Sequence, residues 1–335
     1  MADLPILTVN NLHVNFYSNR RCNEAVRGVS FELKRRKTLC LVGESGCGKT
    51  VTGTAIMGLL PQTSRIEKGE IIYHSEQGDI EVHKLDQNGS KMRSIRGSEM
   101  AMIFQDPMTA LNPVYTVGFQ IMESLLYHTK MAKEERKSKA IELLRNMKIP
   151  LPEQRLNEYI HQYSGGMRQR AMIAIAMSCN PKVLIADEPT TALDVTIQAQ
   201  IFELMRELQE EYDTALLLIT HDMGVVAELA DEVVVMYMGS AVESGTVEDV
   251  LRRPAHPYTK ALLKSIPILG RSKVQGLEPI RGITPDPYDR PLGCQFHPRC
   301  DFRTDKCFEE PTYCNVEDGH KTKCWHYKEV LAIGE

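Results

Sequence analysis

GESGCGKT, residues 43–50, is the stretch that decides how this chain folds. It fits the pattern of a glycine, four residues, a glycine, a lysine and a serine or threonine, which binds phosphate groups. An apolar run at 38–42 predicts a strand before it, and residues 49–60 predict a helix that Pro61 ends. A glycine-rich turn between a strand and a helix points backbone N–H groups and the positive helix end at a phosphate. The stretch therefore predicts a nucleotide-phosphate site.

Each position of this stretch has an expected role at a nucleotide. Its glycines let the backbone curl, so that successive N–H groups point inward. Lys49 is expected to reach the β and γ phosphates, and the Thr50 hydroxyl is expected to bind Mg²⁺. The residues expected to contact the nucleotide here are Gly43, Glu44, Ser45, Gly46, Cys47, Gly48, Lys49, Thr50 and Val51.

A second signal lies in VLIADEP, residues 183–189. The apolar run at 183–186 predicts a buried strand, and the carboxylates of Asp187 and Glu188 follow where it ends. Adjacent strand residues point to opposite faces of a sheet, so the two carboxylates can take different roles. We expect Asp187 to hold Mg²⁺ and Glu188 to polarise the attacking water as a general base.

A third signal is the histidine at 221. The apolar run at 215–220 predicts another strand, and His221 follows it directly. A lone histidine at a strand end is more often structural than catalytic. The carboxyl ends of parallel strands form one ligand-binding edge, however, so we expect His221 at the same edge as Asp187. There it is interpreted as a catalytic sensor of the γ-phosphate.

A fourth segment, YSGGMRQR at residues 163–170, precedes the Asp187 strand. With it, the chain resembles the ATP-binding cassette (ABC) family, the nucleotide-binding subunits of ABC transporters, over roughly residues 5–260. In that family this segment is donated across a dimer to the γ-phosphate of the opposite subunit's ATP. The resemblance carries this role to Ser164, Gly165 and Gly166. A serine hydroxyl and glycine N–H groups that open a helix form an anion site.

Further segments match the family in the expected order. Gln105, in MIFQDP, resembles the glutamine of the loop that joins the nucleotide site to a helical subdomain, which implies a catalytic role and a place in the Mg²⁺ shell. Residues 192–194 resemble the loop that links the two active sites of a dimer. Phe16 resembles the aromatic residue that stacks on adenine, and Tyr17 is its close alternative, because stacking needs only an aromatic face.

Composition sets further bounds. The 335 residues suffice for a nucleotide-binding domain and a smaller appendage. A net charge of -4, with acidic and basic residues mixed, gives no indication of a nucleic-acid partner. The longest apolar runs, near 216–219 and 233–236, are shorter than the about 20 residues that a membrane helix needs. No export signal precedes Leu4, so membrane association is expected only through partner subunits.

Together these features predict an α/β fold, a P-loop ABC-type nucleotide-binding domain at residues 1–253. The resemblance implies a mostly parallel core sheet, an antiparallel β subdomain at 5–35 and 66–86, and an α-helical subdomain at about 107–180. From 254 to 335, prolines are frequent and periodicity is weak, which indicates a C-terminal extension.

Five of the nine cysteines lie in this extension. A cytosolic chain seldom keeps disulfides, so clustered thiols indicate a metal. Four thiolates can hold either zinc or an iron–sulfur cluster. The paired cysteines of zinc ribbons are absent, but three histidines keep zinc as an alternative: His297, His320 and His326.

The extension also carries a narrower resemblance. HPYTKALL (256–263) and GCQFHPRC (293–300) are similar to the C-terminal extension of dipeptide and oligopeptide permease ATPases. In that subfamily, cysteines that match four of the five here are linked with a [4Fe–4S] cluster, which we expect ahead of zinc. Cys314 falls outside the pattern. The four are Cys294, Cys300, Cys307 and Cys324.

The resemblance implies an ATPase, with ATP and Mg²⁺ as cofactors, that powers a membrane importer of dipeptides or oligopeptides. Import of another solute, such as nickel or a small glycoside, is the alternative. The implied partners are integral-membrane permease subunits, a second ABC ATPase subunit that is usually a paralogue, and indirectly an extracytoplasmic solute-binding protein. The chain would then lie peripherally on the cytoplasmic face of the cell membrane.

Overall fold

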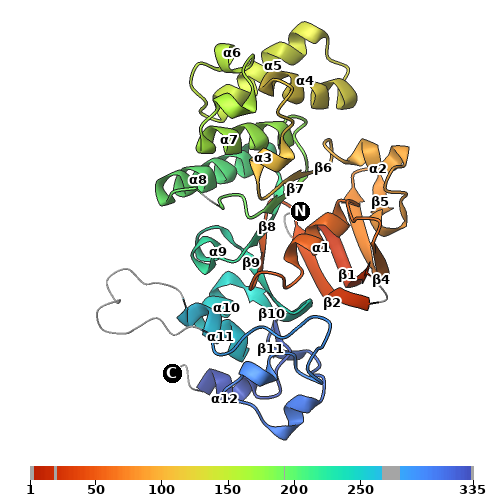
Figure 1. Ribbon diagram of the computed structural model, residues 1–335, viewed down its shortest axis with the longest axis vertical. Coiled ribbons are helices and arrows are strands. Elements are labelled where there is room, and N and C mark those ends of the chain that lie inside the picture. Colours follow the sequence, from red (N-terminus) through yellow and green to blue (C-terminus); the bar gives the residue numbers. More distant parts are fainter. Residues whose placement is uncertain (1–3, 19–20, 192, 266–279, 333–335) are drawn as a thin grey trace. The chain divides into compact units, whose positions relative to one another are not determined.

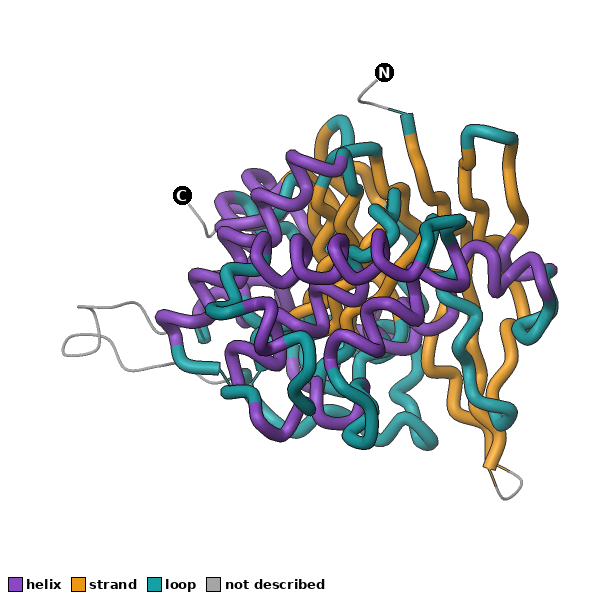
Figure 2. The backbone as a smooth tube through the Cα atoms, turned by 90° about the horizontal axis from the view of Figure 1, so that it is seen from above, coloured by secondary structure: helices purple, strands orange, loops and turns teal. Residues whose placement is uncertain are grey.

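The computed structural model describes residues 4–18, 21–191, 193–265 and 280–332 (Figure 1). The chain combines helices, purple in Figure 2, with strands, orange. It divides into two compact units. The first unit comprises Met1–Ile6, Leu33–Lys37 and Lys84–Leu218. The second comprises Leu7–Glu32, Thr38–His83 and Ile219–Glu335.

The first unit is mainly helical. In α4, Val117, Ile121 and Leu125 are buried on one face at a spacing of four residues, and the helix contacts α5 and α7. Thr116 caps its N-terminus by accepting a hydrogen bond from the N–H of Phe119. Its helices are α2 (Ser90–Ile95), α3 (Pro107–Ala110), α4 (Val117–His128), α5 (Lys133–Asn146), α6 (Pro152–Arg155), η2 (Ile160–Gln162), α7 (Gly165–Ala176) and α8 (Val195–Tyr212).

Two strands of the first unit lead into residues of the predicted site. β6 (Met100–Ile103) and β7 (Val183–Asp187) pair in parallel, and every residue of both is buried. The strand predicted before Asp187 is thus confirmed, and it includes Asp187 itself. Because the strands run in the same direction, the residues after them emerge at the same edge.

The predicted antiparallel sheet is confirmed, and it lies almost wholly in the second unit. β1 pairs antiparallel with β4, and β4 pairs antiparallel with β5. The two longest strands of this sheet have 14 residues each. In spatial order the strands are β2 (Arg21–Lys34), β1 (Pro5–Ser18), β4 (Ser64–Ser75) and β5 (Gly78–Glu81).

The second unit also contains five strands of a larger sheet. β3 and β9 are parallel, and the neighbours beyond β9 pair antiparallel. Two of these strands lie within residues 254–335, whose weak periodicity did not predict them. β8 (Ala215–Thr220), a confirmed strand, continues from the first unit into the second. The order is β11 (Cys314–Glu317), β12 (His320–Thr322), β10 (Ser240–Thr246), β9 (Glu232–Tyr237) and β3 (Thr38–Val42).

The helix after the phosphate-binding stretch is shorter than predicted. α1 (Lys49–Ile56) ends four residues before the expected end at 60. Gly58 has a φ of 58° and donates to the carbonyl of Ala55, which closes the helix in a left-handed turn. The remaining helices of this unit are η1 (Val82–Lys84, which spans the boundary), α9 (Met223–Leu229), α10 (Val247–Arg252), α11 (Pro257–Lys264), η3 (His297–Arg299), η4 (Asp305–Phe308) and α12 (Tyr327–Ala332).

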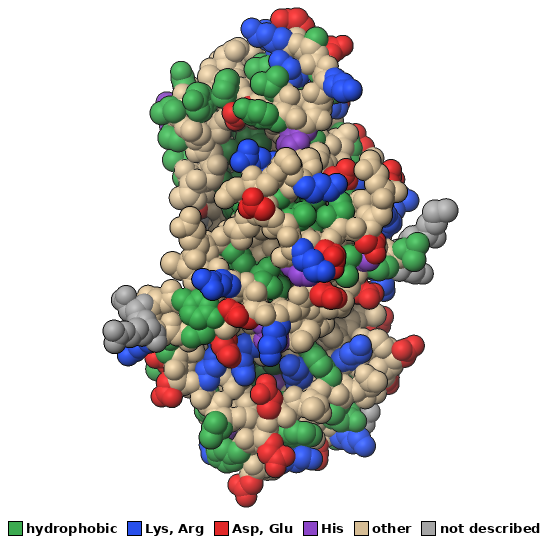
Figure 3. Space-filling model, turned by 90° about the vertical axis from the view of Figure 1, so that its right-hand side faces the viewer, with side chains coloured by type: hydrophobic (Ala, Val, Ile, Leu, Met, Phe, Trp, Pro, Cys, Tyr) green, Lys and Arg blue, Asp and Glu red, His purple; other side chains and the backbone are tan. Residues whose placement is uncertain are grey.

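One face of the molecule carries charges of both signs. On the face drawn in Figure 3, Lys and Arg side chains are interspersed with Asp and Glu side chains. In the part of the chain that the structure describes, no helix combines the length and apolar character needed to cross a membrane.

Candidate nucleotide-binding site

The GESGCGKT stretch, here called the phosphate loop (residues 43–50), connects β3 to α1. All five residues of β3 are buried, so the strand fixes the start of the loop in the core. Lys49 is only 5% exposed, and its ammonium donates hydrogen bonds to the carbonyls of Gly43 at 2.7 Å and Glu44 at 3.0 Å. The loop thus curls around the lysine charge that is expected to meet the phosphates.

Two glycines are required by the shape of this loop. Gly48 has a φ of 101°, and a Cβ there would lie 2.4 Å from the carbonyl oxygen of Ala25. Gly46 has a φ of 80° and no neighbour within 4 Å of a Cβ, so its backbone conformation alone favours glycine. Both glycines therefore adopt backbone conformations that other residues disfavour.

The residues predicted to contact the nucleotide differ in their solvent exposure. Ser45, Gly46 and Thr50 are exposed, so their polar groups are accessible to a ligand. Cys47 is buried, and burial raises the pKa of its thiol. Its side chain therefore packs as a neutral core residue, and Val51 at the start of α1 is half-buried.

Glu44 has partners that the sequence did not indicate. Its backbone N–H donates to the hydroxyl of Tyr258 at 2.8 Å. Its carboxylate accepts two hydrogen bonds from the guanidinium of Arg299, at 2.7 and 3.0 Å. Tyr258 and Arg299 both come from the extension, more than 200 residues along the chain, so no spacing rule links them to the loop.

Both candidates for adenine stacking lie at the end of β1. Phe16 is half-buried and stands opposite Ser64 of β4. Tyr17 is 43% exposed, and its hydroxyl donates to Glu67 at 2.5 Å. This hydrogen bond raises the pKa of Tyr17. The two rings remain alternatives, with Tyr17 the more accessible.

The first unit brings two predicted catalytic side chains together. The amide of Gln105 donates to the carboxylate of Glu188 at 3.1 Å, and the Thr191 hydroxyl donates to the same oxygen at 3.0 Å. Glu188 has a φ of 45°, a costly conformation for a residue other than glycine. Asp187, directly before it, is only 3% exposed. The turn after β7 thus holds the two carboxylates in different environments.

Ser164 stands at the N-terminus of α7 in the first unit. Its side chain accepts from the N–H of Met167 at 3.4 Å, which is the geometry of an N-cap. Ser164 and Gly165 are exposed, and Gly166 is half-buried, so the helix start is accessible to a partner. Asp194 caps α8 in the same way, whereas Ala192 of the 192–194 segment lies outside the described residues.

His221 lies in the second unit, directly after β8. It is exposed, and the next residue, Asp222, caps α9 by accepting from the N–H of Gly224 at 2.7 Å. The strand end predicted for His221 is confirmed. Its role toward a γ-phosphate stays a prediction.

The four cysteines that were predicted to bind a cluster line one small cavity in the extension. Cys294, Cys300, Cys307 and Cys324 surround it with His256, His297 and His326. Burial raises the pKa of Cys294, and it raises that of Cys300 to about 11 and that of Cys324 to about 12. Across the described parts of the chain, no three His, Cys, Asp or Glu side chains form a group that could hold a metal ion.

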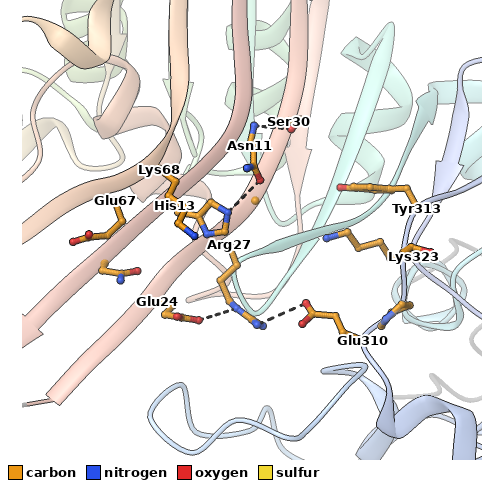
Figure 4. Close-up of a pocket in the computed structure, with 14 residues that line it drawn as sticks. Asn11, His13, Glu24, Arg27, Ser30, Glu67, Lys68, Glu310, Tyr313 and Lys323 are labelled. Atoms are coloured by element: carbon orange, nitrogen blue, oxygen red, sulfur yellow. Dashed lines mark hydrogen bonds and ion pairs between the residues drawn. The ribbon is translucent and has the colours of Figure 1, made fainter.

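A second, polar hollow lies between the antiparallel sheet and the extension (Figure 4). Arg27 lies at its centre and pairs with Glu24 of β2 at 3.0 Å and with Glu310 of the extension at 3.7 Å. Lys323 faces the same hollow and lies over the ring of Tyr313. One ion pair, between Arg27 and Glu310, thus joins the sheet and the extension across this hollow.

A buried lysine enclosed by a glycine-rich loop between a strand and a helix is the phosphate-binding element of a P-loop ATPase. The family described as "ABC transporter" matches residues 26–191. The family described as "Oligopeptide/dipeptide transporter, C-terminal region" matches residues 242–307. The chain belongs to the ABC transporter family, with the C-terminal region of oligopeptide and dipeptide transporters.

Similar proteins match along nearly the whole chain. The oligopeptide transport ATP-binding protein AppD of Bacillus subtilis is 48% identical over 97% of both chains. The dipeptide transport ATP-binding protein DppD of Escherichia coli is 46% identical, again over 97% of both.

Solved structures match the cassette. The dimeric ATP-binding cassette MJ0796, in a post-hydrolysis state bound to ADP and Pi, is 26% identical with a TM-score of 0.63. The match covers 72% of this chain and 98% of the MJ0796 chain. The protein cbiO1 of Clostridium perfringens, part of the transporter complex cbiONQ, is 26% identical with a TM-score of 0.60 and covers 73% of this chain and 90% of its own.

Proposed function

We propose that this chain is the ATP-hydrolysing subunit of a membrane importer of dipeptides or oligopeptides. It works as one half of a nucleotide-sandwich dimer with a second ATPase subunit. One observation carries this proposal: relatives named as dipeptide and oligopeptide transport ATP-binding proteins match 97% of the chain, including the extension. The chain acts with integral-membrane permease subunits, from a peripheral position on the cytoplasmic face of the membrane.

In this proposal the phosphate loop would hold the triphosphate, and Thr50, Gln105 and Asp187 would hold Mg²⁺. When bound there, Mg²⁺ would neutralise charge that develops on the phosphate oxygens. Glu188 accepts a proton from the attacking water, while Gln105 orients the Glu188 carboxylate through the hydrogen bond between them. Ser164 of each cassette faces the γ-phosphate of the other, and its exposed position at the start of α7 supports this role.

The proposed domain organisation is a nucleotide-binding domain at 1–253, which includes a helical subdomain at about 107–180, and an extension at 254–335. The helices α3 to α7 support the helical subdomain. The extension adds β11 and β12 to the sheet beside β10.

The cavity in the extension supports a [4Fe–4S] cluster held by Cys294, Cys300, Cys307 and Cys324. Thiol ligands of a cluster lie farther apart than those of a single zinc ion, because four irons and four sulfides separate them. The four thiols line one cavity, and this donor set matches the Cys ligands that such a cluster needs. When bound, the cluster would stabilise the fold of a proline-rich segment whose own hydrophobic core is small.

The cluster proposal predicts the metal content of the protein. Anaerobically purified protein should contain about four iron and four sulfide per chain, and Cys300→Ser should lower both. Cys314→Ser is the matched control and should leave the content unchanged, because Cys314 lies outside the cavity. Wild-type protein that contains zinc and no iron would contradict the cluster proposal and favour a zinc site.

The peptide-transport proposal predicts substrate-dependent ATPase activity. We expect a purified transporter, reconstituted with its binding protein, to hydrolyse ATP several-fold faster when a dipeptide or short oligopeptide is added. Nickel and a small glycoside are the comparison solutes. Stimulation by one of these, with none by any peptide, would assign the transporter to that solute.

A further inference from the structure

Arg299 is a buried charge in the extension. Its side chain is 4% exposed, and it occupies the last position of η3, directly before Cys300. A buried guanidinium is stable only when its N–H groups have partners. The hydrogen-bond partners of Arg299 therefore indicate its structural role.

Arg299 makes a paired contact with one carboxylate, and it also donates to the hydroxyls of Tyr237 and Thr284. Two of its nitrogens donate to the two carboxylate oxygens of Glu44, at 2.7 and 3.0 Å. The Nε donates to the carbonyl of Arg281 at 2.8 Å, which fixes the plane of the guanidinium. Paired, charge-assisted hydrogen bonds of this kind are the strongest and most directional that side chains form. Arg299 therefore sets the position of the Glu44 side chain.

The backbone of Glu44 is also bound by a residue of the extension. Its N–H donates to the hydroxyl of Tyr258, whose ring packs against Tyr237 and Phe296. Phe296 belongs to the same short segment as Arg299, and the guanidinium also lies over its ring. Residues of the extension thus form hydrogen bonds with both the backbone and the side chain of Glu44.

Glu44 is in turn linked directly to Lys49. Its carbonyl accepts from the Lys49 ammonium at 3.0 Å and from the N–H of Cys47 at 3.3 Å. A displacement of Glu44 would shift the carbonyl that orients the lysine and change the curl of the loop. The chain of contacts runs from Arg299 through Glu44 to Lys49 without a gap.

We propose that Arg299 is a positioning residue for the ATP site, which holds the phosphate loop in its binding conformation through Glu44. The extension is then part of the nucleotide site, and a change at the neighbouring Cys300 segment can alter ATP affinity. Arg299 itself does not touch ATP. This inference rests on the proposed ATPase function.

The test is a double-mutant cycle on Mg·ATP affinity with Arg299→Gln, Glu44→Gln and the double variant. Each single variant should raise the Kd and the KM for ATP about 10-fold and change kcat by less than about 2-fold. The double variant should be no worse than either single variant, because both remove the same link. Arg299→Lys keeps the charge but loses the paired geometry, so its effect should be intermediate.

The matched control is Arg253→Gln. Arg253 makes a similar paired contact with Glu317, at 3.0 and 2.7 Å, and therefore tests loss of an ion pair of the extension that does not bind the phosphate loop. It should leave the Kd for ATP unchanged. Unchanged affinity in Arg299→Gln, or additive effects in the double variant, would overturn this inference alone. A wild-type protein that binds no ATP would overturn the proposed function as well.

Discussion

Glu188→Gln is expected to lower ATP turnover by about 10²- to 10⁴-fold while Mg·ATP still binds. The substitution keeps the shape of the side chain and its place at the end of β7, but the amide cannot accept the proton of the attacking water. The acceptor that Gln105 and Thr191 now orient would be replaced by a group that is neutral. Single-turnover hydrolysis and an ATP titration on the same sample separate the two effects.

A second glutamate of the same unit provides the control. Glu207 pairs with Lys148 on the surface, where both side chains are about half exposed, so Glu207→Gln should leave turnover unchanged. Wild-type turnover in Glu188→Gln would show that another group is the general base.

Lys49→Ala is expected to weaken ATP binding by about 10- to 100-fold or more. Hydrogen bonds to charged groups contribute about 1.5–3 kcal/mol each, and every 1.4 kcal/mol is tenfold in affinity. The lysine is nearly fully buried within the loop. Isothermal titration with Mg·ATP measures the change directly.

Lys139→Ala, which removes a surface lysine paired with Glu142, is the control and should bind ATP normally. A thermal melt of Lys49→Ala checks that the variant is folded. A folded Lys49→Ala protein with wild-type affinity would contradict the role of the phosphate loop.

Much of the site could be predicted because its signals are local. The loop residues, the carboxylates after β7 and the histidine after β8 are each fixed by a few neighbours in the sequence. The strand predicted at 38–42 is confirmed as β3, and that at 215–220 is confirmed as β8. Apolar runs of this kind have few alternatives to burial in a sheet.

Features that depend on distant partners could not be predicted. β11 and β12 are short and polar, and their strand conformation comes from pairing with each other and with β10. Arg299 and Glu44 are 255 positions apart, and nothing in either local sequence marks the other. The early end of α1 depends on the left-handed conformation of Gly58, and Pro61 was the stronger signal.

The positive φ of Glu188 was likewise not predicted. If the strand had continued, the side chains of Glu188 and Asp187 would point to opposite faces of the sheet. The turn instead begins at Glu188 and aims its carboxylate at Gln105. Strain of this kind is common where a side chain must be held for chemistry.

The central claim is that ATP is held between two cassettes, with Ser164 of one facing the phosphate loop of the other. Sedimentation velocity of the Glu188→Gln protein, alone and mixed with the second ATPase subunit, tests it most directly. We predict that Mg·ATP produces a complex of two cassettes and that Ser164→Arg abolishes it. A protein that binds ATP but remains monomeric at saturating ATP, in both samples, would contradict the claim.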